Sequence, residues 1–436
     1  MVQEQIGEQT LGTLVDGEFD AGASVETTLV YIGSPVNGFG GAGQRFSLMG
    51  VTGVRFVRAE GSTLEAEARP LSGSTARELE IAVPLQWVSA MHARLSIRGD
   101  SQFHLVDCGS RNGTFVEGHR IRRVTPVSDG DLIEVGRSFW MLRSQRVAAE
   151  SGIVETSNPV LGGTARALAR LAASEVPIVL LGETGVGKTE LAAAIHRASG
   201  RMGPLVQVHV MVESARTRLL TELAERARGG TLLLEDVGEL CPRGQAELLA
   251  ALMARVTAEQ IRIVATSTRD LRQMVDTQTF RPDLYARLAG YEAKLPPLRD
   301  RREDLGQLVH RLARLDSGKS VEIETDVFRD MLGHDWPFNL RELKHAVESA
   351  LALTGEITST ESARIDMKIW DRVVWRASDL PSPARIAAVR HELVQQLSTH
   401  AGNTSAVAAS LRCEISDIER WLHRFSIEPT RYAPPP

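Results

Sequence analysis

The sequence of 436 residues contains few cysteines and no long apolar run, the features that would indicate an oxidising compartment or a membrane protein. Its three cysteines, Cys108, Cys241 and Cys413, are far apart. None has a neighbour at the spacing of metal ligands or of a disulfide framework. No apolar run approaches the roughly 18 residues that a membrane span needs. The first ten residues are polar and acidic, unlike a secretion signal. These absences predict a cytoplasmic protein with no membrane partner.

The sequence also has no excess of basic residues. The formal net charge is −5 at pH 7, so any binding of nucleic acid must be local. The hydrophobic fraction of 43% is ordinary for globular proteins and allows several cores. The length predicts two to four domains.

A strand, a glycine-rich loop and a helix follow one another at residues 176–195. The apolar run Ile178–Leu181 predicts a buried strand, and Gly182-x-x-x-x-Gly187-Lys188-Thr189 follows it directly. This is the phosphate-binding loop in its expected context. Its glycines let backbone N–H groups surround phosphate oxygens, and the helix N-terminus favours an anion. We therefore expect ATP to contact Gly182, Glu183, Thr184, Gly185, Val186, Gly187, Lys188, Thr189 and Glu190.

Short β-like runs separated by Gly, Asp and Asn extend from about residue 44 to 143, a spacing typical of a β-sandwich. Residues 88–95, 105–115 and 127–136 resemble a forkhead-associated (FHA) domain. The resemblance implies a β-sandwich whose loops bind phosphothreonine peptides. It places His92 behind the site as a brace. The residues that it assigns to the peptide, with Arg111 as a substitute cation, are Arg58 (or Arg69), Ser89, Arg111, Asn112 and Gly113.

The FHA motif departs from the family pattern at its cationic positions. The glycine that normally precedes the arginine is Val57, and the basic residues that usually follow the serine are Ala90 and Met91. A phosphate needs charge-assisted hydrogen bonds to offset its desolvation. A sandwich that has lost phosphopeptide recognition is therefore the alternative.

Six motifs between residues 158 and 355 resemble the AAA+ module of sigma-54 (enhancer-binding) transcription activators. They lie at 195–197, 229–240, 261–271, 280–288, 295–305 and 336–343. The resemblance implies an α/β ATPase core, a helical lid and assembly into a ring, usually a hexamer. With Thr189, Glu235 would hold Mg²⁺, and Asp236 would orient the attacking water. The other residues that it assigns to catalysis are the trans-acting Arg281 and Arg287, the sensor Thr268 and the lid arginine Arg341.

The ATPase motifs depart from the family at four points. The family carboxylates run Asp then Glu, whereas this chain has Glu235 then Asp236. A misplacement of about 1 Å can cost on the order of a hundredfold in rate, so ATP hydrolysis stays open. His209 replaces an asparagine, and Phe338 replaces the lid glycine.

The fourth departure is the absence of the Gly-Ala-Phe-Thr-Gly-Ala loop that contacts sigma-54. The chain has only residues 210–228 there, and their pattern predicts one amphipathic helix. Direct remodelling of sigma-54 polymerase is therefore not expected, and a contact with RNA polymerase stays open.

Residues 386–397 predict a helix, and residues 400–427 predict a helix, a tight turn and a second helix. They resemble the Fis-type helix-turn-helix that closes enhancer-binding activators, whose second helix lies in the DNA major groove. The alternative is a packing or dimerisation module, because Glu414, Asp417 and Glu419 share the second helix. The residues expected to contact DNA are Arg412, Ser416, Arg420, His423 and Arg424.

The predicted fold is multi-domain: an FHA-like β-sandwich, an α/β AAA+ P-loop domain with an α-helical lid, and an all-α helix-turn-helix. The expected units are 1–40 (flexible), 41–146 (sandwich), 147–158 (linker), 159–298 (ATPase core), 299–366 (lid), 367–383 (linker) and 384–436 (helix-turn-helix). We expect an ATP-binding transcription regulator that binds DNA and senses a phosphothreonine partner. A degenerate ATP-binding FHA scaffold and an AAA+ remodeller of a non-polymerase target are the alternatives.

Overall fold

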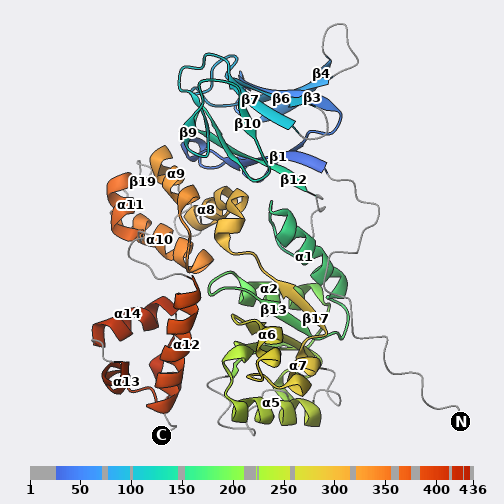
Figure 1. Cartoon of the computed structure of the whole chain (residues 1–436), viewed down its shortest axis with the longest axis vertical. Coiled ribbons are helices and arrows are strands. Elements are labelled where there is room, and N and C mark those ends of the chain that lie inside the picture. Colours follow the sequence, from blue (N-terminus) through green and yellow to red (C-terminus); the bar gives the residue numbers. More distant parts are fainter. Residues whose placement is uncertain are drawn as a thin grey trace, which may run out of the picture.

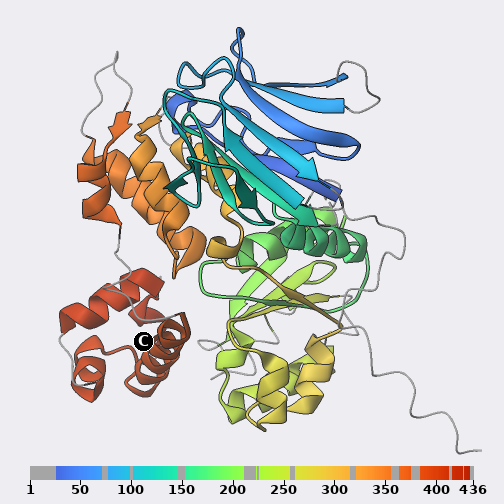
Figure 2. The same ribbon diagram turned by 45° about the horizontal axis from the view of Figure 1, so that its top comes forward.

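The structure is a computed structural model. It describes residues 26–70, 77–98, 102–145, 153–210, 222, 225–255, 261–314, 321–354, 363–374, 383–411, 415–425 and 427–432. Figures 1 and 2 show a β-sandwich, a helical lid, an ATPase core and a C-terminal helical unit. No described helix combines the length and apolar character required to cross a bilayer.

Two six-stranded sheets form the sandwich. One has the order β2 (Arg45–Ser47), β1 (Glu26–Gly33), β12 (Ser138–Gln145), β11 (Leu132–Val135), β8 (Thr114–Val116), β9 (His119–Arg120). The other has the order β10 (Thr125–Val127), β7 (Gln102–Asp107), β6 (Ala93–Arg98), β3 (Val51–Arg58), β5 (Arg77–Val83), β4 (Glu65–Pro70). Between them Trp140 is fully buried and packs against the rings of Tyr31 and Phe56.

The sandwich begins earlier than the sequence pattern indicated. Strand β1 pairs with β12 from Glu26 to Gly33, and its last six residues are buried. Residues 35–37 then form a 3-10 helix. The expectation of a flexible segment is therefore wrong for residues 26–40: the short strand that the sequence indicates at residues 28–32 extends over Glu26–Gly33 and is ordered by burial against β12.

The ATPase core contains a five-stranded parallel sheet. Its order is β14 (Leu205–His209), β15 (Thr231–Glu235), β16 (Arg262–Ser267), β13 (Ile178–Leu181), β17 (Tyr291–Lys294). The helices of this part are α1 (Pro159–Leu171), α2 (Lys188–Ala198), α5 (Pro242–Arg255), α6 (Leu271–Asp276) and α7 (Pro282–Leu288). The strands are parallel, so the polar residues after β13, β15 and β16 meet at one edge.

The lid and the C-terminal unit are helical. The lid contains α8 (Leu305–Arg314), α9 (Thr325–Gly333), α10 (Asn339–Leu353), α11 (Met367–Val373) and the short pair β18 (Val321–Ile323) and β19 (Ala363–Ile365). The C-terminal unit contains α12 (Pro383–Thr399), α13 (Thr404–Leu411) and α14 (Ile415–Phe425). Both views place this unit below the lid and beside the ATPase core. The helix predicted over 210–228 falls mainly on residues 211–224, which lie largely outside the described residues.

The sandwich and the lid share one hydrophobic core. Ile32 and Phe139 of the sandwich belong to the same buried cluster as Phe328 of α9, and the Phe139 and Phe328 ring centroids are 5.1 Å apart. At its edge, the Arg329 guanidinium pairs with the Glu134 carboxylate at 2.5 Å. The sandwich is thus fixed to the lid by packing as well as by charge.

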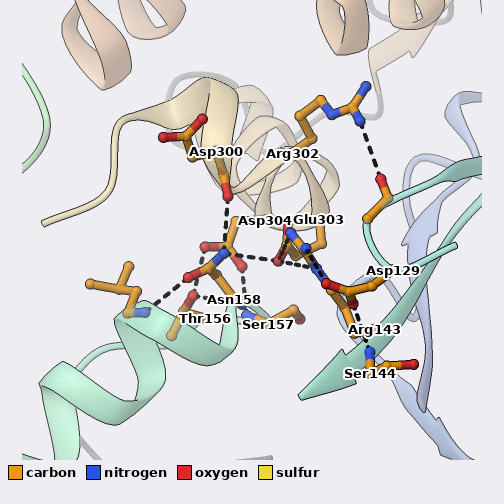
Figure 3. A network of polar contacts seen from close by, with 12 residues as sticks. Asp129, Arg143, Ser144, Thr156, Ser157, Asn158, Asp300, Arg302, Glu303 and Asp304 are labelled. Carbon is orange, nitrogen blue, oxygen red and sulfur yellow. Dashed lines mark hydrogen bonds and ion pairs between the residues drawn. The ribbon is translucent and has the colours of Figure 1, made fainter. Parts of the chain in front are cut away.

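A polar network ties the segment before α1 to the lid (Figure 3). The Thr156 hydroxyl donates to Asp304 Oδ2 at 2.6 Å, and the Ser157 N–H donates to Asp304 Oδ1 at 2.5 Å. The Asn158 side chain caps α1 by accepting from the Leu161 N–H. It also donates to Glu303, which pairs with Arg143 of the sandwich at 2.7 Å. Three parts of the chain therefore meet here.

Candidate nucleotide site

The phosphate-binding loop connects β13 to the N-terminus of α2, as its spacing predicts. Gly185 has φ +75°, and a Cβ there would lie 2.2 Å from the Phe338 carbonyl oxygen. Glycine is therefore required both for the backbone conformation and for the close approach of the lid. The Lys188 ammonium donates to the carbonyl oxygens of Gly182 and Glu183 at 2.8 and 2.9 Å. It lies folded over the loop.

The residues expected to hold Mg²⁺ lie side by side. The Thr189 hydroxyl donates to Glu235 Oε1 at 2.6 Å, and Gln207 Nε2 donates to Glu235 Oε2 at 2.8 Å. A hydroxyl and a carboxylate oxygen are donors that Mg²⁺ accepts. This donor set fits the ion.

Asp236 follows with a left-handed backbone, φ 57°. Its N–H donates to the Thr266 hydroxyl at 3.1 Å, and His209 Nε2 lies 3.6 Å from its Oδ2. The Arg390 guanidinium donates to the same Oδ2 at 2.6 Å. Burial acts to raise the pKa of Asp236, but Arg390, Lys188 and His209 outweigh it and hold that pKa below its usual value. Asp236 is thus a carboxylate at neutral pH.

These groups line one cavity of about 720 Å³, a volume within the usual range of ligand pockets. Thr268 and Arg341 also line it, as predicted for sensor residues. The Thr268 hydroxyl is 3.5 Å from Glu239 Oε1, and an Arg341 N–H is 3.4 Å from the Phe425 carbonyl oxygen. Burial lowers the pKa of Arg341, and the nearby Arg390 lowers it further. Lys188, Arg341 and Arg390 thus share the cavity with the carboxylates of Glu235 and Asp236.

Two residues of the loop turn away from this cavity. The Glu183 carboxylate pairs with Arg299 at 2.6 Å and accepts from the Asn339 side chain at 3.2 Å. The Val186 side chain is buried in the core beside α2. They attach the loop to the lid and to the core, so only their backbone is available to a phosphate.

The structure does not bring Arg281 or Arg287 into the cavity of their own subunit. Both are exposed, and Arg281 pairs with Asp283 at 2.6 Å. Arg287 lines a separate hollow of about 280 Å³.

The loops expected to bind phosphothreonine are joined through His92, which is fully buried. The Ser89 N–H donates to His92 Nδ1 at 3.0 Å, so His92 Nε2 carries the proton and donates to the Gly113 carbonyl oxygen at 3.1 Å. Burial lowers the pKa of His92, which favours this neutral form. The Arg58 N–H donates to the Ser89 carbonyl oxygen, and the Arg111 N–H donates to the Ser89 hydroxyl.

Asn112 serves the same loops by donating to the Trp87 carbonyl oxygen at 2.6 Å. The five predicted peptide contacts thus belong to adjoining loops. Arg69 lies on the edge strand β4, opposite Glu78.

Four of the five residues expected to contact DNA lie on α14, whose backbone alone is described at those positions: Ser416, Arg420, His423 and Arg424. Arg412 lies outside the described residues. A second helix after a short connection is present, and its role in DNA binding stays a prediction.

No sequence pattern indicated that Gln207 or Arg390 lies at the nucleotide site. Gln207 alternates with the buried Val206 and Val208 on β14, a pattern that indicates solvent exposure. Arg390 lies on a helix about 150 positions beyond Asp236 in a separate unit. The one sequence feature that pointed to a contact from another unit was the bulky Phe338, which stands where the family has a glycine.

Comparison with known families agrees with this geometry. The model "Sigma-54 interaction domain" matches residues 159–298. This part of the chain is therefore similar to a sigma-54 interaction domain. Models of the FHA domain and of the AAA+ ATPase lid domain match residues 73–136 and 299–368. The sandwich and the P-loop domain with its lid are thereby confirmed.

Curated relatives match this chain over part of its length. The phenol regulator MopR of Acinetobacter guillouiae is 38% identical over 218 residues, 43% of this chain and 39% of MopR. The regulatory protein AtoC of Escherichia coli is 34% identical over 243 residues, 48% of this chain and 52% of AtoC. The chain therefore spans between about two fifths and half of these relatives. The crystal structure of NtrX from Brucella abortus with ADP is 26% identical, has a TM-score of 0.44 and is matched over 62% of this chain and 68% of NtrX.

Proposed function

We propose that this chain is an ATP-binding transcription regulator that senses a phosphothreonine partner and holds DNA through its C-terminal unit. The observation that supports nucleotide binding best is the Thr189–Glu235 pair at the mouth of a phosphate-binding loop, inside a cavity of about 720 Å³. The sigma-54 interaction domain supports a role in transcription. Without the Gly-Ala-Phe-Thr-Gly-Ala loop, the output does not pass through the usual contact with sigma-54.

The residues of the cavity have separate tasks in this proposal. Backbone N–H groups of the loop and Lys188 bind the phosphates, and Thr189 with Glu235 holds Mg²⁺. Mg²⁺, when bound with the nucleotide, neutralises charge on the phosphate oxygens. Asp236, kept ionised, accepts a hydrogen bond from the attacking water and orients it. Arg281 and Arg287, exposed and outside their own cavity, act on the site of a neighbouring subunit in a ring.

ATP turnover measured against protein concentration tests this proposal, with Lys188→Ala and Arg287→Ala as variants. Turnover per subunit should rise cooperatively with concentration, and each substitution should lower it at least about a hundredfold, the scale of a lost catalytic group. Nucleotide binding without turnover would assign ATP a structural or switching role. A folded protein that binds neither ATP nor ADP would refute the proposal.

The phosphothreonine proposal rests on the His92 brace and the adjoining Ser89, Arg58 and Asn112 loops. We expect the intact protein to bind phosphothreonine peptides from a library and to ignore their unphosphorylated forms. Ser89→Ala and Arg58→Ala should each weaken binding about tenfold or more, because each removes one donor to the phosphate. Equal capture of both peptide forms would favour a sandwich that serves only as a scaffold.

The DNA proposal rests on the order of α13 and α14 and on the basic residues of α14. At physiological salt, the intact protein should bind a promoter fragment more tightly than random DNA, and Arg420→Gln should weaken that binding about tenfold. Indifference to the DNA sequence, together with an unchanged affinity in the variant, would favour the scaffold or a remodeller of another protein.

A further inference from the structure

The C-terminal unit forms one wall of the nucleotide cavity of its own chain. Five of its residues line that cavity: Arg390, Phe425, Ile427, Glu428 and Tyr432. The opposite walls are the phosphate-binding loop, the carboxylates after β15 and the lid helix α10. The docked unit therefore encloses the space for a nucleotide without filling it.

The lid residue Phe338 packs into the core of this unit. Phe338, which stands where the family has a glycine, is 1% exposed and belongs to the hydrophobic core of α12, α13 and α14. Its ring lies edge-on to Phe425 with centroids 5.6 Å apart. The same residue passes close to Gly185 of the loop through its carbonyl oxygen. Phe338 therefore connects the two: its side chain packs in the C-terminal unit, and its backbone lies against the phosphate-binding loop.

Arg390 is the group that this unit places deepest in the site. It is 6% exposed. One terminal nitrogen donates to Asp236 Oδ2 at 2.6 Å, and the other lies 3.7 Å from Glu239 Oε1. This second nitrogen is buried and makes no hydrogen bond to the described residues. The neighbouring His391 also pairs with Glu239. Glu239 therefore neutralises the charge of Arg390 only in part.

We propose that Arg390 is a ligand of the terminal phosphate of a nucleoside triphosphate bound in the same subunit, so that the C-terminal unit distinguishes triphosphate from diphosphate. This rests on the proposed binding of ATP. Asp236, the carboxylate that Arg390 contacts, is the residue proposed above to orient the water that attacks the terminal phosphate. A guanidinium presents several donors in one plane and can hold a carboxylate and a phosphate oxygen together.

The charge in the cavity supports the same assignment. Lys188, Arg341 and Arg390 lie close enough that each guanidinium lowers the pKa of the lysine, although burial is the larger cause. Confined cations of this kind are stabilised by an anion with several oxygens. The terminal phosphate of a triphosphate is such an anion, whereas a diphosphate does not reach Arg390. The unit is then held by Phe338 and by the Arg390–Asp236 pair in either state, and by an additional Arg390–phosphate contact only with the triphosphate.

Affinities for Mg²⁺ with ADP and with a non-hydrolysable ATP analogue test the proposal on the full chain. Arg390→Gln should weaken binding of the analogue about tenfold to a hundredfold, the scale of a charge-assisted hydrogen bond, and change ADP affinity less than about threefold. Arg372→Gln, the same substitution at an exposed residue of α11 outside the cavity, should change neither. Equal losses for both nucleotides, or none, would overturn the proposal. A wild-type protein that binds neither nucleotide would instead refute the nucleotide site itself.

Hydrogen exchange of α12 gives a readout that does not depend on affinity. At saturating nucleotide, amides of α12 in the wild type should exchange more slowly with the ATP analogue than with ADP. In Arg390→Gln the two nucleotides should give equal rates. Equal rates in the wild type would contradict the assignment even if the affinities differ.

Discussion

Lys188 is a buried cation of the phosphate-binding loop. Burial lowers its pKa to about 8, although the Asp236 carboxylate opposes the shift, and Arg390 and Arg341 add to it. A bound triphosphate favours the ammonium and so raises that pKa. Nucleotide binding near pH 8 must therefore take up a proton.

The pH dependence of ATP-analogue binding follows from this lysine. The empty site loses its ammonium as pH rises through about 8, so affinity should be constant below pH 7 and fall about tenfold between pH 7 and 9. Titration calorimetry in buffers of different ionisation enthalpy measures both the affinity and the proton uptake. Because Arg390 lowers this pKa, Arg390→Gln should move the decline to higher pH. A flat profile up to pH 9.5 would show that Lys188 stays charged in the empty site.

Asp304 carries the opposite kind of shift at the junction of sandwich, linker and lid. Burial, together with the adjacent Glu303, raises its pKa to about 6. A carboxyl with a raised pKa binds its proton more tightly when folded, so its contribution to stability is complete below about pH 4. That contribution is lost as pH rises through about 6.

Thermal unfolding between pH 4 and 7 tests this contribution. The wild type should lose up to about 3 kcal/mol relative to Asp304→Asn across that range, from a shift of about two units. Asp300→Asn, at an exposed neighbour, is the control. Parallel profiles of the wild type and Asp304→Asn would refute the assignment.

At the level of single residues, motif spacing predicted the groups that share one loop or sheet edge. Thr189 and Glu235 were expected together, because β13 and β15 are parallel strands of one sheet and end at one edge. Arg390 was beyond prediction, because only the docking of a separate unit brings α12 to Asp236. Side-chain directions such as that of Glu183 likewise depend on the lid.

At the level of elements, the sequence indicated a short strand at residues 28–32 but not that it belongs to the sandwich. Glu26–Gly33 lies among Gly-rich and acidic residues, and its burial depends on pairing with β12, more than a hundred positions later. Local pattern alone cannot report such a partner.

The packing of Phe338, directly before α10, against the C-terminal unit can be tested by substitution. Phe338→Ala should release the C-terminal unit, because a buried phenylalanine contributes about 3 to 5 kcal/mol to packing. We expect amide exchange of α12 to accelerate at Leu393 and Leu397, which pack in the same cluster, while the sandwich strands stay protected. Val160→Ala, at an exposed position of α1, is the control. Unchanged exchange in α12 would show that Arg390 or other contacts suffice for docking.

At the level of the whole molecule, the sandwich is built into the ATPase through the lid. Gly306 of α8 lies against the backbone of β1, and a Cβ there would be 1.7 Å from the Ile32 carbonyl oxygen. No side chain can be added without separating the two parts. The FHA domain match gives the sandwich its family, but the shared core is outside what a family pattern describes.

Gly306→Ala should therefore destabilise the protein even though alanine favours helices by about 1 kcal/mol. We expect calorimetry to resolve a separate unfolding transition for the sandwich at lower temperature. Gly333→Ala, at the end of α9 with open space around its Cβ, should be neutral or slightly stabilising. A single unshifted transition in Gly306→Ala would mean that the interface adapts at little cost.

The common core of sandwich and lid has a mechanical consequence. Domains joined by a flexible linker can rotate independently, but two parts that bury one cluster of side chains move together as one rigid body. Any rotation of the lid about the nucleotide must then swing the Ser89 and Gly113 loops through a larger arc, and a bulky protein held by those loops must resist the same rotation. A protein bound to the sandwich would therefore oppose rotation of the ATPase lid, without any change of shape within the sandwich.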